Sequence, residues 1–438
     1  MMKRKFAILS LTAAACLGLA LGLAACTDNN ADNTGGGTTD DPVPVHVHRV
    51  SADSDGVCDD CHETLYEGSM GFTPSDNLKY YKASASGCKG DVTVPSYYKG
   101  RGETEYLPVL ELTLGGNNVE SLHIPAGIEA IGRDSLNVVC MNALTEVTIE
   151  SGNTHYYVED DALYKVDDDN LIMAWNIGET YTIPDKVDTI RTSMFYSCVD
   201  LVNLVIPASV KEIQSNAFSN CKNLKSVIFE EGSQLDLIGE NAFLRCTLIK
   251  EIKIPASVDS IGRFSFRYCE ALSELTFEKN SQLKTIEDMA FQFTNIKSVI
   301  LPKSLEILNN VFSESLQSVA FEEGSQLKTL GESAFVSYTN LKTVQLPDGL
   351  KTIENRAFYR CSSLMEIKLP DSLETIGERA FYNSGILEIY LPASLQTVGA
   401  DIAPFADIYV PLAENEIPSG WDSNWASGAD VFYNYQGE

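Results

Sequence analysis

Basic residues and histidine are scarce in this 438-residue chain. Lysine and arginine number 32 against 61 aspartates and glutamates, which gives a formal net charge of −29 at pH 7. Nucleic acid is polyanionic and is bound through clusters of lysine and arginine. The charge balance therefore argues against nucleic acid as a partner. Only five histidines are present, so the side chain that most often transfers protons at neutral pH is rare.

Catalytic and nucleotide-binding motifs are also missing. The chain has no Gly-x-x-x-x-Gly-Lys phosphate loop and no recognisable spacing of a nucleophile, a base and an orienting group. His123 and His155 stand alone in the sequence. We therefore expect a non-enzymatic protein that requires no cofactor, and an envelope hydrolase is the weakest alternative.

The chain begins with three basic residues and an apolar stretch. Lys-Arg-Lys at residues 3–5 precedes residues 6–25, and Leu23-Ala24-Ala25-Cys26 ends the stretch. This order is typical of a targeting segment and resembles the lipobox of bacterial lipoproteins. The resemblance implies a signal peptide at residues 1–25, a lipid on Cys26, and anchoring to the extracellular face of the bacterial cell membrane. An uncleaved membrane-spanning helix is the alternative, because about 20 apolar residues can cross a bilayer.

Residues 26–45 consist mostly of Asn, Asp, Gly, Thr and Pro. Such a composition buries too little apolar surface to offset the entropy lost on folding. We expect this segment to be a flexible tether.

Potential metal ligands gather in residues 46–65. Soft thiolates and imidazoles suit zinc, which usually takes four ligands in a structural site. Here the candidate ligands are His46, His48, Cys58 and Cys61, with His62 as a substitute. The sequence therefore predicts a zinc-binding knuckle, and a structural rather than a catalytic one.

Two alternatives to zinc remain for the same segment. Asp53, Asp55, Gly56 and Asp59 resemble a calcium loop, but the twelfth position of that loop, which should be acidic, is His62. Calcium is therefore the weaker metal. The segment can also lack a metal altogether, because thiols oxidise outside the cell and Cys58 and Cys61 can form a disulfide.

A phenylalanine recurs through most of the chain. Its successive spacings are 23, 25, 23, 25, 21, 23, 23 and 23 residues, a period that indicates a solenoid. Strand-like segments with alternating apolar residues accompany it, as at residues 224–229, 296–301 and 364–369. Coils stacked in register would bury one continuous core. The recurring residues are Phe195, Phe218, Phe243, Phe266, Phe291, Phe312, Phe335, Phe358 and Phe381.

The repeat unit resembles that of BspA-like leucine-rich-repeat proteins of bacterial surfaces, approximately Ile-Gly-x-x-Ala-Phe-x-x-Cys-x-x-Leu-x-x-Val-x-Ile-Pro. Residues 261–277 and 353–370 match it closely. We expect a mainly β, leucine-rich-repeat-type solenoid of 21–25-residue repeats over residues 113–395. The resemblance implies a cell-surface lipoprotein, and members of the family include adhesins that bind extracellular-matrix proteins. Extracellular proteins or glycans are therefore the expected partners.

Other segments interrupt or close the solenoid. Residues 66–112 carry short alternating runs that predict a β-rich N-terminal cap, and a β-hairpin insert is expected at about residues 154–179. Residues 396–438 are expected to form a C-terminal cap, with a final strand at residues 408–411. The large apolar residues that would cover the last coil are Trp421, Trp425, Val431, Phe432 and Tyr433.

Five cysteines share one position of the repeat, namely Cys198, Cys221, Cys246, Cys269 and Cys361. A small buried thiol can face turn carbonyls in coil after coil. We therefore expect core packing rather than metal or redox chemistry. A disulfide between neighbouring coils would strain the stack.

One outward stripe of the stacked strands is the predicted binding face. Apolar residues at such outward positions hint at a contact surface, although β-branched residues are also ordinary strand formers. A structural spacer without a soluble ligand is therefore the alternative function. The eight residues of the stripe that are expected to contact a ligand are Val205, Ile228, Lys253, Thr276, Ile300, Gln345, Lys368 and Tyr390, and the same outward position is held by His123, Thr148, Thr182 and Ala320.

Overall fold

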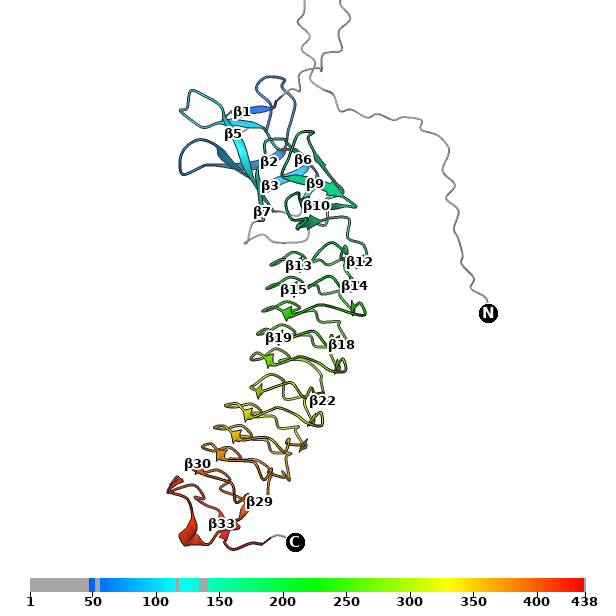
Figure 1. The fold of residues 1–438 in the computed structure, drawn as a ribbon. Coiled ribbons are helices and arrows are strands. Elements are labelled where there is room, and N and C mark those ends of the chain that lie inside the picture. Colours follow the sequence, from blue (N-terminus) through cyan, green and yellow to red (C-terminus); the bar gives the residue numbers. More distant parts are fainter. Residues whose placement is uncertain (1–46, 52–55, 116–117, 134–140, 437–438) are drawn as a thin grey trace, which may run out of the picture.

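The computed structural model describes residues 47–51, 56–115, 118–133 and 141–436. The expected signal peptide, Cys26 and the tether lie outside these ranges. The described chain forms a β-rich N-terminal part followed by a stack of coils that runs to the C-terminus (Figure 1). Its one helix is the three-residue 3-10 helix η1 (Glu414–Glu416), and no described helix is long and apolar enough to cross a membrane.

An eight-stranded sheet organises the N-terminal part. Its order is β1-β4-β5-β3-β6-β8, with β2 paired to β3 and β7 paired to β5. The sheet includes strands on both sides of the expected boundary at residue 112. Its strands are β1 (Arg49–Ser51), β2 (Glu67–Pro74), β3 (Tyr81–Thr93), β4 (Tyr97–Lys99), β5 (Leu107–Leu114), β6 (Val119–Ile124), β7 (Ala130–Arg133) and β8 (Glu146–Ile149).

The described part of residues 46–65 is built into this sheet. β1 pairs with β4 in parallel. Val50, Cys58 and Leu65 are buried in the core of the N-terminal sheet. The segment therefore shares a core with residues 66–112 instead of standing beside it as a separate knuckle.

A β-hairpin follows the sheet. β9 (Tyr156–Glu159) and β10 (Ala162–Lys165) pair antiparallel, and β11 (Leu171–Ala174) pairs with β10. The two residues between β9 and β10, Asp160 and Asp161, have φ angles of 48° and 56°. Positive φ at both central residues is the geometry of a tight type I′ hairpin turn.

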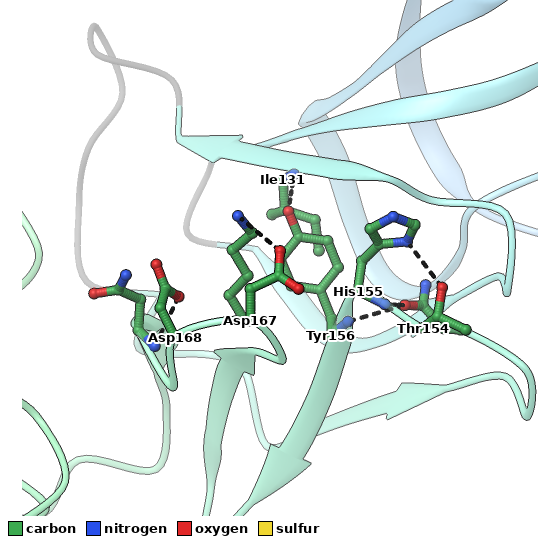
Figure 2. Close-up of polar contacts among 9 residues, drawn as sticks. Ile131, Thr154, His155, Tyr156, Asp167 and Asp168 are labelled. Atoms are coloured by element: carbon green, nitrogen blue, oxygen red, sulfur yellow. Dashed lines mark hydrogen bonds and ion pairs between the residues drawn. The ribbon is translucent and has the colours of Figure 1, made fainter.

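The hairpin lies between two hydrophobic cores. Ala162 and Tyr164 belong to the core of the coils, whereas Leu163 belongs to the core of the N-terminal sheet. Successive side chains of a strand point to opposite faces, so β10 contributes to both cores. Figure 2 shows Tyr156 pointing towards Ile131, whose backbone N–H donates to the Tyr156 hydroxyl oxygen at 2.8 Å. That bond joins the hairpin to β7.

Two rows of parallel strands on opposite sides of the stack build the coils (Figure 1), and each row is divided into shorter sheets. The two rows are called here the long ladder and the short ladder. The long ladder contains β12 (Thr180–Thr182), β14 (Asn203–Ile206), β16 (Ser226–Phe229), β18 (Glu251–Ile254), β20 (Glu274–Phe277), β22 (Ser298–Leu301), β24 (Ser318–Phe321), β26 (Thr343–Val344), β29 (Glu388–Tyr390), β31 (Asp407–Tyr409) and β33 (Asp430–Phe432). The short ladder contains β13 (Thr189–Ile190), β15 (Glu212–Ile213), β17 (Leu237–Ile238), β19 (Ser260–Ile261), β21 (Thr285–Ile286), β23 (Ile307–Leu308), β25 (Thr329–Leu330), β27 (Thr352–Ile353), β28 (Thr375–Ile376), β30 (Thr397–Val398) and β32 (Gly420–Trp421). The predicted leucine-rich-repeat-type solenoid is confirmed.

The recurring phenylalanines form a stacked column inside the coils. Phe266 is fully buried, and its ring centroid lies 5.1 Å from those of Phe243 and Phe291, with nearly parallel planes. The same stacking joins Phe195 to Phe218 at 5.2 Å. Each ring fills the space between its neighbours in the coils above and below, which is why the residue recurs once per coil.

Most of the recurring cysteines line the same core. Their thiols donate to the backbone carbonyl of the phenylalanine one coil earlier, as Cys221 does to Phe195 at 3.0 Å and Cys361 does to Phe335 at 3.1 Å. Cys246 and Cys269 make the equivalent bonds at 3.2 and 3.3 Å. The predicted packing of thiols against turn carbonyls is confirmed for these four residues.

Cys198 is different, because it is disulfide-bonded. The expectation that packing alone accounts for the shared position is therefore wrong for this cysteine. The thiol-to-carbonyl bond of the other cysteines would require a recurring phenylalanine in the coil before Cys198. Phe195, which lies in the same coil as Cys198, is the first phenylalanine of the series, so none precedes it.

The buried thiols are expected to resist alkylation in the folded chain. Burial raises the pKa of Cys361 to about 12 and also raises the pKa of Cys246 well above its usual value. These groups are therefore neutral thiols at about pH 8, whereas the thiolate is the nucleophile. Mass spectrometry after iodoacetamide treatment should find them modified in urea but not under native conditions. Fast native alkylation of Cys361 would contradict the packing described here.

The third expected strand, at residues 364–369, is not a strand. Its apolar residues Ile367 and Leu369 are buried as the alternation requires. However, no amide of residues 365–369 donates to a backbone carbonyl within the described chain. Alternation predicts which side chains face the core, but it does not encode ladder hydrogen bonds. The long ladder is therefore interrupted between β26 and β29, as it also is between β16 and β18 and between β20 and β22.

Parallel pairing continues beyond residue 395. β30 pairs with β32, and β31 pairs with β33. The strand expected at residues 408–411 is β31, and it is not the final one because β33 follows it. Trp421 and Trp425 are buried, whereas Phe432 is 45% exposed. The expectation that Phe432 covers the last coil is wrong, because it occupies an outward position of β33.

Candidate binding face

The eight residues of the predicted stripe lie along the long-ladder side of the coils. Val205 pairs with Ile228, and Lys253 pairs with Thr276, at the same register position of neighbouring coils. Val205 is half-buried and the other seven residues are exposed. Those seven are Ile228, Lys253, Thr276, Ile300, Gln345, Lys368 and Tyr390.

A shallow groove of about 700 Å³ crosses the middle of this face. Thr276, Ile300, Ala320 and Gln345 contribute to its lining. Ile300, a large apolar side chain, is 63% exposed. This groove contains three of the eight predicted ligand-face residues, and Ala320 holds the same outward position.

A larger groove of about 1300 Å³, called here the C-terminal groove, opens where the long ladder is interrupted. Its lining includes Gln345, Met365, Lys368, Leu387, Tyr390 and Tyr435. Met365 is 62% and Leu387 is 69% exposed. The groove therefore combines three predicted stripe residues with two protruding apolar side chains that the stripe did not include.

The sequence of the repeat units could have identified Met365 and Leu387 as unusual. Both immediately follow the first apolar residue of the strand-like segment, as in Leu364-Met365 and Ile386-Leu387. Six earlier units have a polar residue at that position: Lys225, Lys250, Ser273, Lys297, Gln317 and Lys342. An alignment of the units against one another would have identified Met365 and Leu387 as apolar exceptions, together with Val202, which is half-buried.

Aromatic side chains border the C-terminal groove. Tyr409 stacks between Tyr390 and Phe432, with ring centroids 4.6 and 4.9 Å apart and nearly parallel planes. Tyr435 lies 5.1 Å from both Tyr390 and Tyr409. The Tyr390 hydroxyl donates to Glu388 at 2.8 Å, and this bond raises the pKa of Tyr390 to about 12. Tyr409 is therefore covered on both faces, while Tyr390 and Phe432 are 43% and 45% exposed.

The two lysines of the stripe have different surroundings. The ammonium nitrogen of Lys253 lies 2.8 Å from a carboxylate oxygen of Glu278. Lys368 makes no ion pair within the described residues. Of the two cations, Lys368 is therefore the one available to an acidic partner group.

The predicted metal ligands lie in the N-terminal part. Ligand atoms of His48, Cys58 and Cys61 all lie within 4.8 Å of one another. His46, like Asp53 and Asp55 of the calcium alternative, lies outside the described residues. The sequence prediction therefore identified three residues that the fold brings together.

These features define a β-solenoid of the leucine-rich-repeat type with an exposed strand face. Its repeat region belongs to the BspA type leucine rich repeat family, which matches residues 188–317 and 284–403 in six copies. No curated protein matches the chain.

Several solved bacterial structures resemble the chain. A leucine-rich repeat protein from Bacteroides ovatus is 20% identical, with 83% of this chain and 98% of that chain covered and a TM-score of 0.50, which shows a shared fold. The pneumococcal vaccine antigen PcpA is 25% identical, with 64% and 88% covered and a TM-score of 0.41. A leucine rich cell surface protein from Faecalibacterium prausnitzii is 18% identical, with 86% and 96% covered and a TM-score of 0.36.

Proposed function

We propose that this protein is a non-enzymatic cell-surface lipoprotein that binds an extracellular protein through the C-terminal groove. Cys26 carries the lipid anchor, and the tether places the solenoid away from the membrane. The lipobox-like start of the sequence and the family's surface proteins support this location. Repeat proteins commonly bind partners on the extended surface that their stacked units create.

The observation that carries the proposal is the local departure from the repeat at Met365 and Leu387. Both side chains protrude into solvent where six other units have a polar residue. Exposed apolar side chains in a groove are typical of interaction sites. The proposal therefore places the partner on two adjacent coils.

The backbone of the same groove favours an extended protein segment as the ligand. The amides of residues 365–369 donate to no backbone carbonyl of the described chain. A partner strand can satisfy such groups by main-chain hydrogen bonding while its side chains enter neighbouring pockets. Lys368 stands in the same segment and can pair with an acidic side chain of the partner.

The aromatic cluster suits a protein ligand. Tyr409 is enclosed between Tyr390 and Phe432, and these two end rings are 43% and 45% exposed. Their exposed surfaces can pack against apolar and aromatic side chains of a protein. Binding to a glycan alone would contradict this choice of partner.

Leu387→Lys is expected to weaken binding roughly 30-fold, because a hot-spot side chain contributes about 2 kcal/mol. The change installs the residue type that other units carry at this position, so the fold should be unaffected. Binding of the purified chain to immobilised matrix proteins and mucins measures the effect. Ile307→Lys is the matched control, because Ile307 is a 50% exposed apolar residue of the short ladder.

Variants of the predicted stripe separate the two grooves. Lys368→Glu should weaken binding of an acidic partner segment, whereas Lys253→Glu and Ile300→Lys should not. Loss of binding only in Ile300→Lys would place the binding site in the groove of about 700 Å³ at the middle of the face. Equal binding by all variants would show that the stripe is not the site, and no binding to any immobilised protein would favour a structural spacer.

A further inference from the structure

We propose that His48, Cys58 and Cys61 bind a structural zinc ion at the edge of the N-terminal sheet. This site lies outside the binding face, and its test is independent of the proposed function. Two thiolates and an imidazole are a ligand set that zinc prefers, whereas calcium and magnesium take oxygen ligands.

The spacing of the three donor atoms fits a tetrahedral ion. The Cys61 sulfur lies 3.8 Å from Nδ1 of His48, and all three donor atoms lie within 4.8 Å of one another. Zinc binds a thiolate at about 2.3 Å and an imidazole nitrogen at about 2.0 Å, so a tetrahedral angle separates those two atoms by roughly 3.5 Å. To bind the ion, the Cys61–His48 pair would contract by about 0.3 Å, and a pair at the 4.8 Å limit by about 1 Å.

Backbone hydrogen bonds hold the two parts of the site together. The Asp59 amide, inside the turn between the cysteines, donates to the Arg49 carbonyl at 2.8 Å. The carbonyl of His48 accepts from the amides of Ser96 and Tyr97 at 3.1 and 3.2 Å. The histidine and the turn are therefore positioned by the sheet and do not depend on the metal for their approach.

The turn itself also has a defined shape. The His62 amide donates to the Cys58 carbonyl at 2.8 Å, and the Cys58 amide donates to the Glu63 carbonyl at 2.9 Å. Cys58 is fully buried, while Cys61 and His48 are half-buried. A metal would therefore be shielded on the Cys58 side, and a fourth ligand would approach from the side of Cys61 and His48.

The arrangement indicates a structural role for the ion. Zinc would connect the start of β1 to the cysteine turn, two segments that are separated in sequence and that both contribute to the N-terminal core. The site lies at the end of the chain that follows the tether, where a cross-link would resist fraying of the first strand. A half-buried position at a sheet edge offers no substrate pocket.

The test titrates the full chain, reduced and freed of metal, with Zn²⁺ in competition with a zinc-binding dye. We expect one zinc ion per chain and an affinity that falls roughly 10-fold or more in Cys61→Ser and in His48→Ala. Cobalt bound in place of zinc should show the thiolate-to-metal charge-transfer absorption, and Cys61→Ser should diminish it. His155→Ala, a change in another histidine of the N-terminal part, is the matched control and should leave both signals unchanged.

Two results would overturn the proposal. One is an absence of saturable zinc binding in the reduced chain. The other is an unchanged affinity in Cys61→Ser, which would show that zinc binds elsewhere. Because Cys61 and His48 are half-buried, both variants should keep the circular dichroism of the parent chain, and an unfolded variant is replaced by Cys61→Ala.

Discussion

Phe266→Ala is expected to lower the free energy of unfolding by about 3–5 kcal/mol. The ring is fully buried and stacks between Phe243 and Phe291. Its removal leaves a cavity that the rigid coils cannot easily close, and the loss extends to both neighbours because each coil is stabilised by the adjacent ones. Urea unfolding followed by circular dichroism measures the effect.

Phe293→Ala is the control for this prediction. Phe293 lies in the next coil and is 45% exposed, and its ring stacks on Tyr268 at 4.6 Å. The same substitution at this surface position should change the free energy of unfolding by at most about 1 kcal/mol. Similar losses in both variants would contradict the assignment of the phenylalanine column as the centre of the core.

Gly262→Ala is expected to destabilise the solenoid by about 1–3 kcal/mol. A Cβ atom at residue 262 would lie 2.7 Å from the Glu240 nitrogen and 2.8 Å from the Gly239 carbonyl carbon, both in the preceding coil. The Gly262 amide donates to the Ile238 carbonyl at 2.7 Å, so the two coils cannot separate without weakening the ladder. Thermal unfolding should show a lower Tm for the variant.

Gly178→Ala tests whether this effect comes from coil contact. A Cβ atom at residue 178 would have no heavy atom within 4 Å. Because alanine also restricts the unfolded chain, this substitution should be neutral or stabilising by up to about 1 kcal/mol. A loss equal to that of Gly262→Ala would mean that glycine flexibility, and not the spacing of coils, explains both positions.

The solenoid could be predicted because its determinants repeat. A buried phenylalanine, usually with a small residue before it, and a segment of alternating apolar residues recur from coil to coil, and each repetition supports the same fold. The thiol-to-carbonyl contacts of Cys221 and its equivalents were predictable for the same reason. The disulfide of Cys198 was not, because this cysteine lies in the first coil of the series, where the repeat context ends.

The C-terminal groove could be predicted only in part. Gln345, Lys368 and Tyr390 follow from the outward stripe of the repeat. Met365 and Leu387 were missed because the stripe takes one position per unit and they occupy another. The interruption of the ladder was not predictable, because residues 364–369 keep the alternation of a strand while their amides lack ladder bonds.

The metal cluster shows a different limit of sequence reasoning. Cys58 and Cys61 are close in sequence, so their joint position in one turn could be expected. His48 joins them because β1 pairs with β4 and because the Asp59 amide bonds to the Arg49 carbonyl. Those contacts depend on the whole N-terminal sheet, and the sequence pattern contained no sign that the segment is part of that sheet.

Hydrogen exchange in the presence of a bound partner tests the central claim most directly. The partner is a matrix protein or mucin that the purified chain binds saturably. We predict that the amides of residues 365–369 and 387–390 become protected, because the partner segment covers Met365 and Leu387 and supplies acceptors that the described solenoid lacks at residues 365–369. Saturable binding that leaves these amides unprotected, and protects another part of the chain instead, would contradict the C-terminal groove as the binding site.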